Sequence, residues 1–277
     1  MRIQQLLPTA ALGRALGRWL SREHHVHGIS PPTPIDALAA TLCPGDVLLV
    51  EGRTRISVAI KYLTQSTWSH AALYVGEHAE TGGEPRAPHC FVEADIVEGV
   101  RLVGLGHFTG LHSRICRPVG LTDDDRDRVI GFALANVGHQ YDLRNVVDLM
   151  RYLVPTPPVP QRWRRRMLAL GSGDPTRAIC STLIARCFQE VRYPILPSIE
   201  TLPAARDDCP DCVEEILRVR HHSLFVPRDF DVSPYFEVVK PTLARGFDYR
   251  RLHWAPETAP IHGTMPAFSR PGDASTP

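Results

Sequence analysis

The chain has 277 residues, of which 43% are hydrophobic and 22% are charged, and its formal net charge at pH 7 is +1. This is the composition of a folded globular protein, and it excludes a disordered, fibrous or membrane-spanning chain. A charge so close to zero gives no overall attraction to nucleic acid, so no nucleic-acid partner is predicted. The seven cysteines lack the spacing of a disulfide framework, which favours a reducing, cytoplasmic location.

The N-terminal segment, residues 1–36, is predicted to be a short amphipathic helix followed by a proline-rich linker at residues 30–36. Leucine and arginine recur in it at helical spacing, at Leu12, Leu16 and Leu20 and at Arg14, Arg18 and Arg22. The arginines interrupt any apolar core of a secretory signal. A docked or frayed terminal helix and a peripheral membrane contact are both consistent with this pattern.

The main folded domain is expected at residues 37–245, and its first half is predicted to be rich in β-strands. Short runs of Val, Leu and Ile are separated by Gly, Pro or polar clusters, and they place strands at Asp46–Val50, His70–Val75, His89–Val97, Val100–Leu105 and Arg114–Val119. Strands this closely spaced favour an antiparallel meander or half-barrel over βαβ units. The predicted fold class is therefore α+β, with an antiparallel sheet packed against helices.

Helices are predicted in the second half. Thr122 can cap a helix whose first turn is acidic and whose apolar face ends near Gly138. A helical, arginine-rich insertion is expected at about residues 143–176, with the Arg162–Arg166 cluster inside it. A further helix is predicted at Ala178–Val191 and a strand at Tyr235–Val239, and residues 246–277 form a proline-rich tail expected to be disordered.

Cys180 falls at the predicted start of the helix at 178–191. Free N–H groups and the helix dipole at such a position lower the pKa of a thiol and can stabilise an oxyanion. A lone cysteine is more often a small buried apolar side chain, and Cys187, on the apolar face of the same helix, is predicted to be one. On position alone, both interpretations of Cys180 stay open.

His70 and Glu93 are the candidate partners of this thiol. In a strand, His70 shares a face with Ala72 and Tyr74, which would mount it rigidly as a general base. Glu93 lies among apolar residues and needs a partner, which an imidazole would supply. Asp95 shares the face of Glu93 and competes with it as the partner of the histidine. The alternative for His70 is a capping or core histidine bonded to a backbone group, and the alternative for Glu93 is an exposed carboxylate on an edge strand.

Several motifs together resemble a known family. They are GDVLL at residues 45–49, SHAALYVG at 69–76, VEA at 92–94, HQYD at 139–142 and CSTLIARCFQ at 180–189. In this order they resemble the permuted papain-like amidases of the YiiX/YaeF type, within the NlpC-type cysteine peptidase superfamily. The resemblance covers about Leu42 to Pro197, and a histidine that precedes the cysteine is the mark of the permutation.

The resemblance implies a circularly permuted papain-like fold and a cysteine hydrolase. It matches Cys180 to the nucleophile, His70 to the base, Glu93 to the orienting carboxylate and Tyr141 to an oxyanion or substrate contact. The implied chemistry is acyl transfer through a thioester, acting as an amidase or peptidase, and it requires no metal and no cofactor. The implied substrate is a peptide, a cell-wall amide or a lipid acyl group.

Two other functions stay open, namely a lipid-directed acyltransferase or thioesterase at a membrane surface and a non-catalytic binding module. The lipid-directed function would use the arginines at 162–166. The alternative interpretation of these arginines is a solvated basic helix. The CPDC segment from Cys209 to Cys212 could bind a metal, but a zinc site normally needs a second ligand pair, and two incidental cysteines in a loop are the alternative. No obligate protein partner is inferred, and the oligomeric state is not predicted.

Overall fold

The computed structural model describes residues 21–22, 31–78, 87–96, 98–139, 179–203, 213–244, 246, 248 and 250. Contacts divide the chain into two units, Met1–Arg245 and Gly246–Pro277. The first unit holds all the helices and strands named below. The domain limits expected from the sequence stay a prediction.

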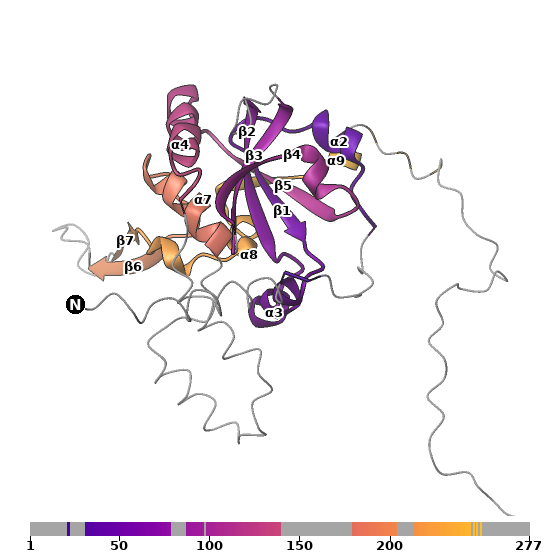
Figure 1. Ribbon diagram of the computed structural model, residues 1–277. Coiled ribbons are helices and arrows are strands. Elements are labelled where there is room, and N and C mark those ends of the chain that lie inside the picture. The colour runs from indigo at the N-terminus through magenta and orange to yellow at the C-terminus, as the bar shows by residue number, and fades with distance from the viewer. Residues whose placement is uncertain are drawn as a thin grey trace, which may run out of the picture. The chain divides into compact units, whose positions relative to one another are not determined.

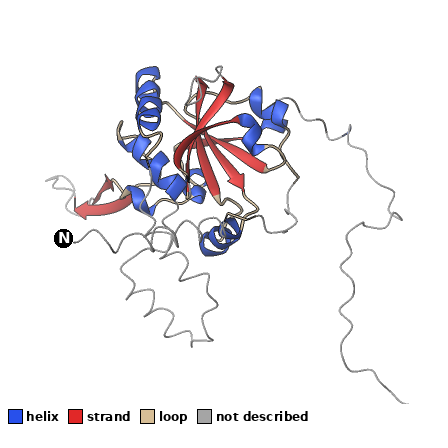
Figure 2. Ribbon diagram, in the orientation of Figure 1, coloured by secondary structure: helices blue, strands red, loops and turns tan. Residues whose placement is uncertain are grey.

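The described part of the first unit contains one antiparallel six-stranded sheet in the order β4-β3-β2-β1-β5-β8 (Figures 1 and 2). Its strands are β1 (Val47–Glu51), β2 (His70–His78), β3 (Ala87–Asp95), β4 (Gly99–Gly104), β5 (His112–Pro118) and β8 (Phe236–Val239). All six were predicted near these limits, and the antiparallel α+β class is confirmed. Consecutive strands β1 to β4 form a meander, because each pairs antiparallel with the next strand along the chain.

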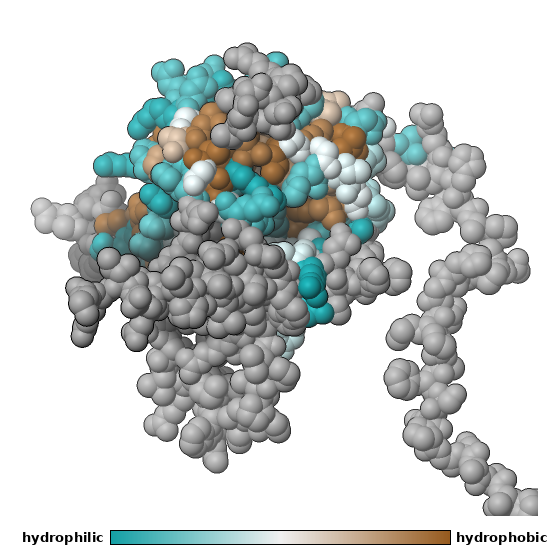
Figure 3. All heavy atoms as spheres, in the orientation of Figure 1, coloured by the Kyte–Doolittle hydropathy of each residue, from teal (hydrophilic) through white to brown (hydrophobic). Residues whose placement is uncertain are grey.

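Helices cover the sheet and its edges, and in Figure 1 α4 and α7 lie together on one side of it. The described helices are α2 (Ile35–Ala39), α3 (Arg55–Thr64), η1 (Leu105–Phe108), α4 (Asp123–Ala135), α7 (Ile179–Gln189), η2 (His222–Leu224), α8 (Pro227–Asp231) and α9 (Pro241–Ala244). The predicted helices at 122–138 and 178–191 correspond to α4 and α7. Hydrophilic side chains cover the outer surface of α4 (Figure 3).

The core consists of two apolar clusters, one on each face of the sheet, because successive side chains of a strand point to opposite faces. Odd-numbered residues of β1 and β2 pack beneath α4 and α7 with Leu183, Ile184 and Phe188. Even-numbered residues pack on the opposite face with Leu38 of α2 and Phe108 of η1. The predicted alternation after His70 is confirmed, since Ala72 and Tyr74 belong to the second cluster and their neighbours to the first.

Several elements differ from the sequence prediction. The expected linker at 30–36 already contains the start of α2, and Thr33 is hydrogen-bonded to Ser113 of β5 and to Leu111, the residue before this strand. Helix α3 was not predicted, nor was the separate hairpin of β6 (Ser198–Pro203) and β7 (Val213–Arg218). Apart from residues 21–22, the helices predicted at residues 1–30 and 143–176 lie outside the described residues.

Candidate active site

Strand register brings His70 and Glu93 together. Leu73 pairs with Val92 across β2 and β3, so Glu93 stands opposite Ala72. His70, two residues before Ala72 on the same face, is therefore the diagonal neighbour of Glu93. Two regular strands hold both side chains, which fixes their relative position.

The imidazole and the carboxylate form a short hydrogen bond. His70 Nε2 lies 2.7 Å from Glu93 Oε2, and the Glu93 side chain is only 1% exposed. The sequence left Asp95 as a competitor of Glu93, but the bond from His70 goes to Glu93, while Asp95 is 27% exposed. Because Nε2 is occupied, Nδ1 is the ring nitrogen left for a second partner.

Two further residues, which the sequence did not reveal, contact the second oxygen of Glu93. Arg101 donates to Oε1 from Nε at 2.8 Å and from Nη2 at 2.6 Å, and His107 Nε2 lies 3.5 Å from the same oxygen. Arg101 stands directly opposite Glu93 in the register of β3 and β4. The sequence held a signal for this pairing, because the two strands that carry Glu93 and Arg101 had been predicted as neighbours along the chain.

The second partner of His70 is Cys180. It is the second residue of α7, a helix that packs on the sheet through Leu183, Ile184 and Phe188. The thiol hydrogen-bonds the His70 side chain and also contacts the backbone N–H of Ala71 and the side chain of Ser181. Folding thus places together a strand start and a helix start that are about a hundred residues apart in the sequence.

The thiol and the imidazole shift each other's proton affinity in opposite directions. Burial raises the pKa of Cys180, but the charge and hydrogen bond of His70 outweigh burial and hold that pKa below its ordinary value. Burial likewise lowers the pKa of His70, but Cys180 and Glu93 raise it well above 6.5. These directions favour a thiolate–imidazolium pair, the reactive form of a cysteine nucleophile.

Glu93 stays ionised in this site. Burial raises the pKa of its carboxyl group, but His70, Arg101 and His107 together lower it to about 2. Cys187 behaves differently from Cys180, because burial raises the pKa of its thiol to about 12. The prediction that Cys187 is an apolar core residue is confirmed, since its side chain is fully buried in the cluster beneath α4 and α7.

Several predicted residues lie outside the described residues, namely Tyr141, the Arg162–Arg166 cluster, Cys209 and Cys212. Within the described ranges, no group of three or more His, Cys, Asp and Glu side chains is placed to hold a metal ion. In the same part of the chain, no helix is both long and apolar enough to cross a lipid bilayer.

An antiparallel sheet that carries a histidine and its carboxylate, with a thiol at the start of a helix packed on that sheet, is the arrangement of a papain-like cysteine hydrolase. Here the histidine precedes the cysteine in the chain. Residues 41–152 match the permuted papain-like amidase family, YaeF/YiiX, C92. The resemblance seen in the motifs is thereby confirmed for this segment, which includes His70 and Glu93 but not Cys180.

Among solved structures, one similar chain is the metalloprotein YiiX from Escherichia coli O157:H7. It is 15% identical, with a TM-score of 0.42, and the match covers 71% of this chain and 96% of that one. The comparison with curated proteins gave no match.

Proposed function

We propose that the chain is a cysteine amidase or peptidase in which Cys180 is the nucleophile, His70 the general acid and base, and Glu93 the orienting carboxylate. The observation that carries the proposal is the contact between the Cys180 thiol and the His70 ring, whose pKa values move in the directions of an ion pair. The family matched by residues 41–152 is one of amidases, which supports an amide as the bond that is cleaved.

The reaction follows from these positions. The Cys180 thiolate attacks the carbonyl carbon of the amide, and the first N–H groups of α7 donate to the oxyanion that develops. The C–N bond then breaks as protonated His70 gives its proton to the leaving nitrogen, which leaves an acyl-thioester on Cys180. Water, deprotonated by His70, attacks the thioester, so the acid is released and the thiol is restored.

Glu93 acts on His70 alone in this scheme. Its bond to Nε2 leaves Nδ1 for the sulfur and stabilises the imidazolium that gives its proton to the leaving amine. Arg101 holds the other oxygen of Glu93, so the carboxylate cannot rotate away from the ring. The lipid-directed alternative depends on segments outside the described residues, and no contact in the site favours it over amide cleavage.

The test is labelling and turnover with matched cysteine variants. A thiol-directed activity probe should label the wild type at Cys180, and Cys180→Ala should lose both labelling and hydrolysis of fluorogenic peptidyl amides by roughly 10³-fold or more. Cys43→Ala is the control, because Cys43 is an exposed free thiol away from the site. Equal labelling and turnover of the wild type and Cys180→Ala would refute the proposal.

A further inference from the structure

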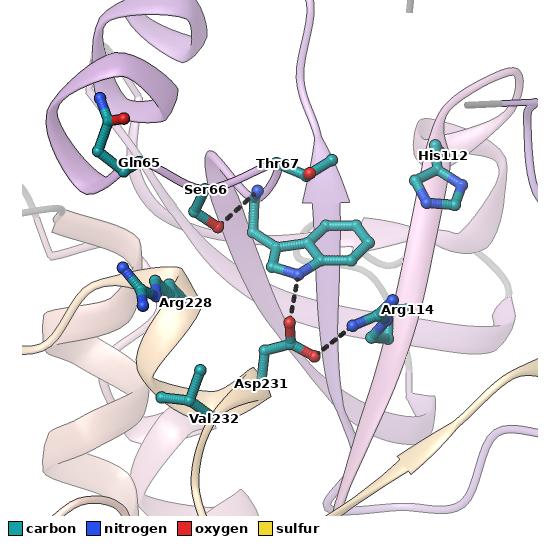
Figure 4. A pocket seen from close by; sticks show the side chains of 9 residues that line it. Gln65, Ser66, Thr67, His112, Arg114, Arg228, Asp231 and Val232 are labelled. Atoms are coloured by element: carbon teal, nitrogen blue, oxygen red, sulfur yellow. Dashed lines mark hydrogen bonds and ion pairs between the residues drawn. The ribbon is translucent and has the colours of Figure 1, made fainter. Parts of the chain in front are cut away.

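A polar pocket of about 350 Å³ is lined in part by the residues that precede His70 in the chain, and it has no part in the reaction described above. Its lining comes from three separate regions, the turn of residues 65–68 before β2, the start of β5 with His112 and Arg114, and helix α8 with Arg228 and Asp231. Figure 4 shows Arg114 and Asp231 joined on one side of the pocket, with Arg228 across from Arg114.

One wall of the pocket is rigid because its polar groups bind each other. Asp231 accepts from Trp68 Nε1 at 2.9 Å and from Arg114 Nη1 at 2.6 Å, so both of its oxygens are occupied. The Arg114 guanidinium lies 4.9 Å from the centre of the Trp68 ring, and the His112 ring stacks on the same indole at 5.3 Å. Asp231, the one acidic side chain among the described lining residues, is thus already neutralised by Arg114.

The pocket has hydrogen-bond donors to which no described residue is an acceptor. Arg228 is exposed and gives one N–H from Nη1 to the Thr64 carbonyl at 3.2 Å, and no described residue accepts from its Nε or Nη2. Ser66 Oγ accepts from the Trp68 backbone at 3.1 Å, which leaves its own proton to donate. With Asp231 paired to Arg114, the charge of Arg228 gives the pocket a net positive character. Free donors and a positive charge suit an anion.

The pocket is within reach of the Cys180–His70 pair. Val50 of β1 pairs with His70 on one side and with Ser113 of β5 on the other, so His70 and Ser113 are two strand spacings apart, about 10 Å. Arg114 pairs with Leu49 and so lies on the face that carries α7, whereas His70 lies on the other face. The link to the site is Trp68, which lines the pocket and is two residues before His70 in the chain. A molecule of modest length can contact both sites.

We propose that this pocket binds an acidic group of the substrate, a carboxylate or a phosphate, held by Arg228 and the Ser66 hydroxyl. The assignment of the group to the substrate rests on the proposed function. The amide cleaved at Cys180 would then belong to a molecule that also carries a negative charge.

The first experiment measures anion binding by itself. Inorganic phosphate, titrated at constant ionic strength in a calorimeter, should bind the wild type and Cys180→Ala alike and bind Arg228→Ala roughly tenfold more weakly. Arg53→Ala is the matched control, because Arg53 is also exposed and donates to a backbone carbonyl, that of Gly110, outside the pocket. Equal phosphate binding by the wild type and Arg228→Ala would overturn the site.

The second experiment identifies the source of the anion. A nitrophenyl ester whose acyl chain ends in a carboxylate is compared with a neutral ester of equal length. The ratio of their kcat/KM values should fall roughly tenfold in Arg228→Ala and stay constant in Arg53→Ala. An unchanged ratio, with phosphate binding lost, would overturn the substrate assignment and leave a site for a free anion. Phosphate binding by a chain that cleaves neither ester would refute the proposed function and leave the anion site standing.

Discussion

At the scale of residues, the candidate site is organised around one buried carboxylate. Three side chains contact Glu93, and they come from β2, β4 and η1. The Arg101 bonds and the His70 bond use different oxygens, so each fixes the direction of the other. Glu93 thereby supplies a full negative charge to His70, and His70 in turn stabilises the thiolate of Cys180.

This chain of contacts predicts the pH dependence of Cys180 alkylation. Because the pKa of Cys180 is lowered, iodoacetamide should alkylate it rapidly well below pH 8.5, where an ordinary thiol is protonated. His70→Gln removes the charge that opposes burial, so the midpoint of the rate profile should move up by at least about one pH unit. Mass spectrometry of the Cys180 peptide separates its rate from that of exposed Cys43.

The same profile provides its own control. Cys187 has a pKa raised to about 12 by burial, so its peptide should stay unlabelled at neutral pH in both proteins. A midpoint for Cys180 that is the same in the wild type and in His70→Gln would show that the imidazole does not stabilise the thiolate.

At the scale of elements, local sequence signals explain some segments and packing explains others. Thr122 caps α4 as expected, with its hydroxyl accepting from the backbone N–H of Asp125 at 3.2 Å. Helix α3 escaped prediction because Ile56, Val58 and Ile60 are β-branched and favour strands. Its helical form is stabilised by the Thr54 cap and by burial of one face, including Ile56.

The cap of α4 gives a prediction of stability. Thr122→Ala removes the acceptor for the first turn and should lower the free energy of unfolding by about 1 kcal/mol. Thr122→Ser keeps the hydroxyl and should remain close to the wild type. Urea denaturation measures both, and an equal loss in the two variants would mean that the cap does not contribute.

At the scale of the whole molecule, the ionisation of Glu93 makes the free energy of unfolding depend on pH. The pKa of Glu93 is about 2 in the folded chain against an ordinary value of 4.5. A carboxyl group whose folded-state pKa is lowered contributes stability that is complete above about pH 4.5 and is lost as the pH falls towards 2. His70, whose pKa is raised, is protonated in both states over this window and does not alter the slope.

Acid titration of stability tests this linkage. Between pH 4.5 and 2 the Glu93 carboxyl should contribute a fall of about 3 kcal/mol in the free energy of unfolding, as judged from urea denaturation at each pH. Glu93→Gln should flatten this fall, whereas Glu237→Gln, which alters an exposed carboxylate of β8, should not. An identical slope in the wild type and in Glu93→Gln would contradict the assignment.

The sequence by itself determined the strands of the sheet, the N-terminal cap of α4, the approximate limits of α4 and α7, and the face on which His70 stands. These features depend on periodicity and on neighbours within a few positions, which a single chain displays directly. The ordered motifs also pointed to His70, Glu93 and Cys180 as one group, although their catalytic roles stay a proposal.

Only the tertiary structure decided which groups meet. It distinguished Glu93 from Asp95, added Arg101 and His107 to the carboxylate, and brought Asp231 to Trp68 across 163 positions of sequence. Strand register and helix docking set such contacts, and both depend on how the whole core packs. No local sequence pattern predicts that packing, so the pocket lined by Trp68, Arg114 and Arg228 could be found only in the folded structure.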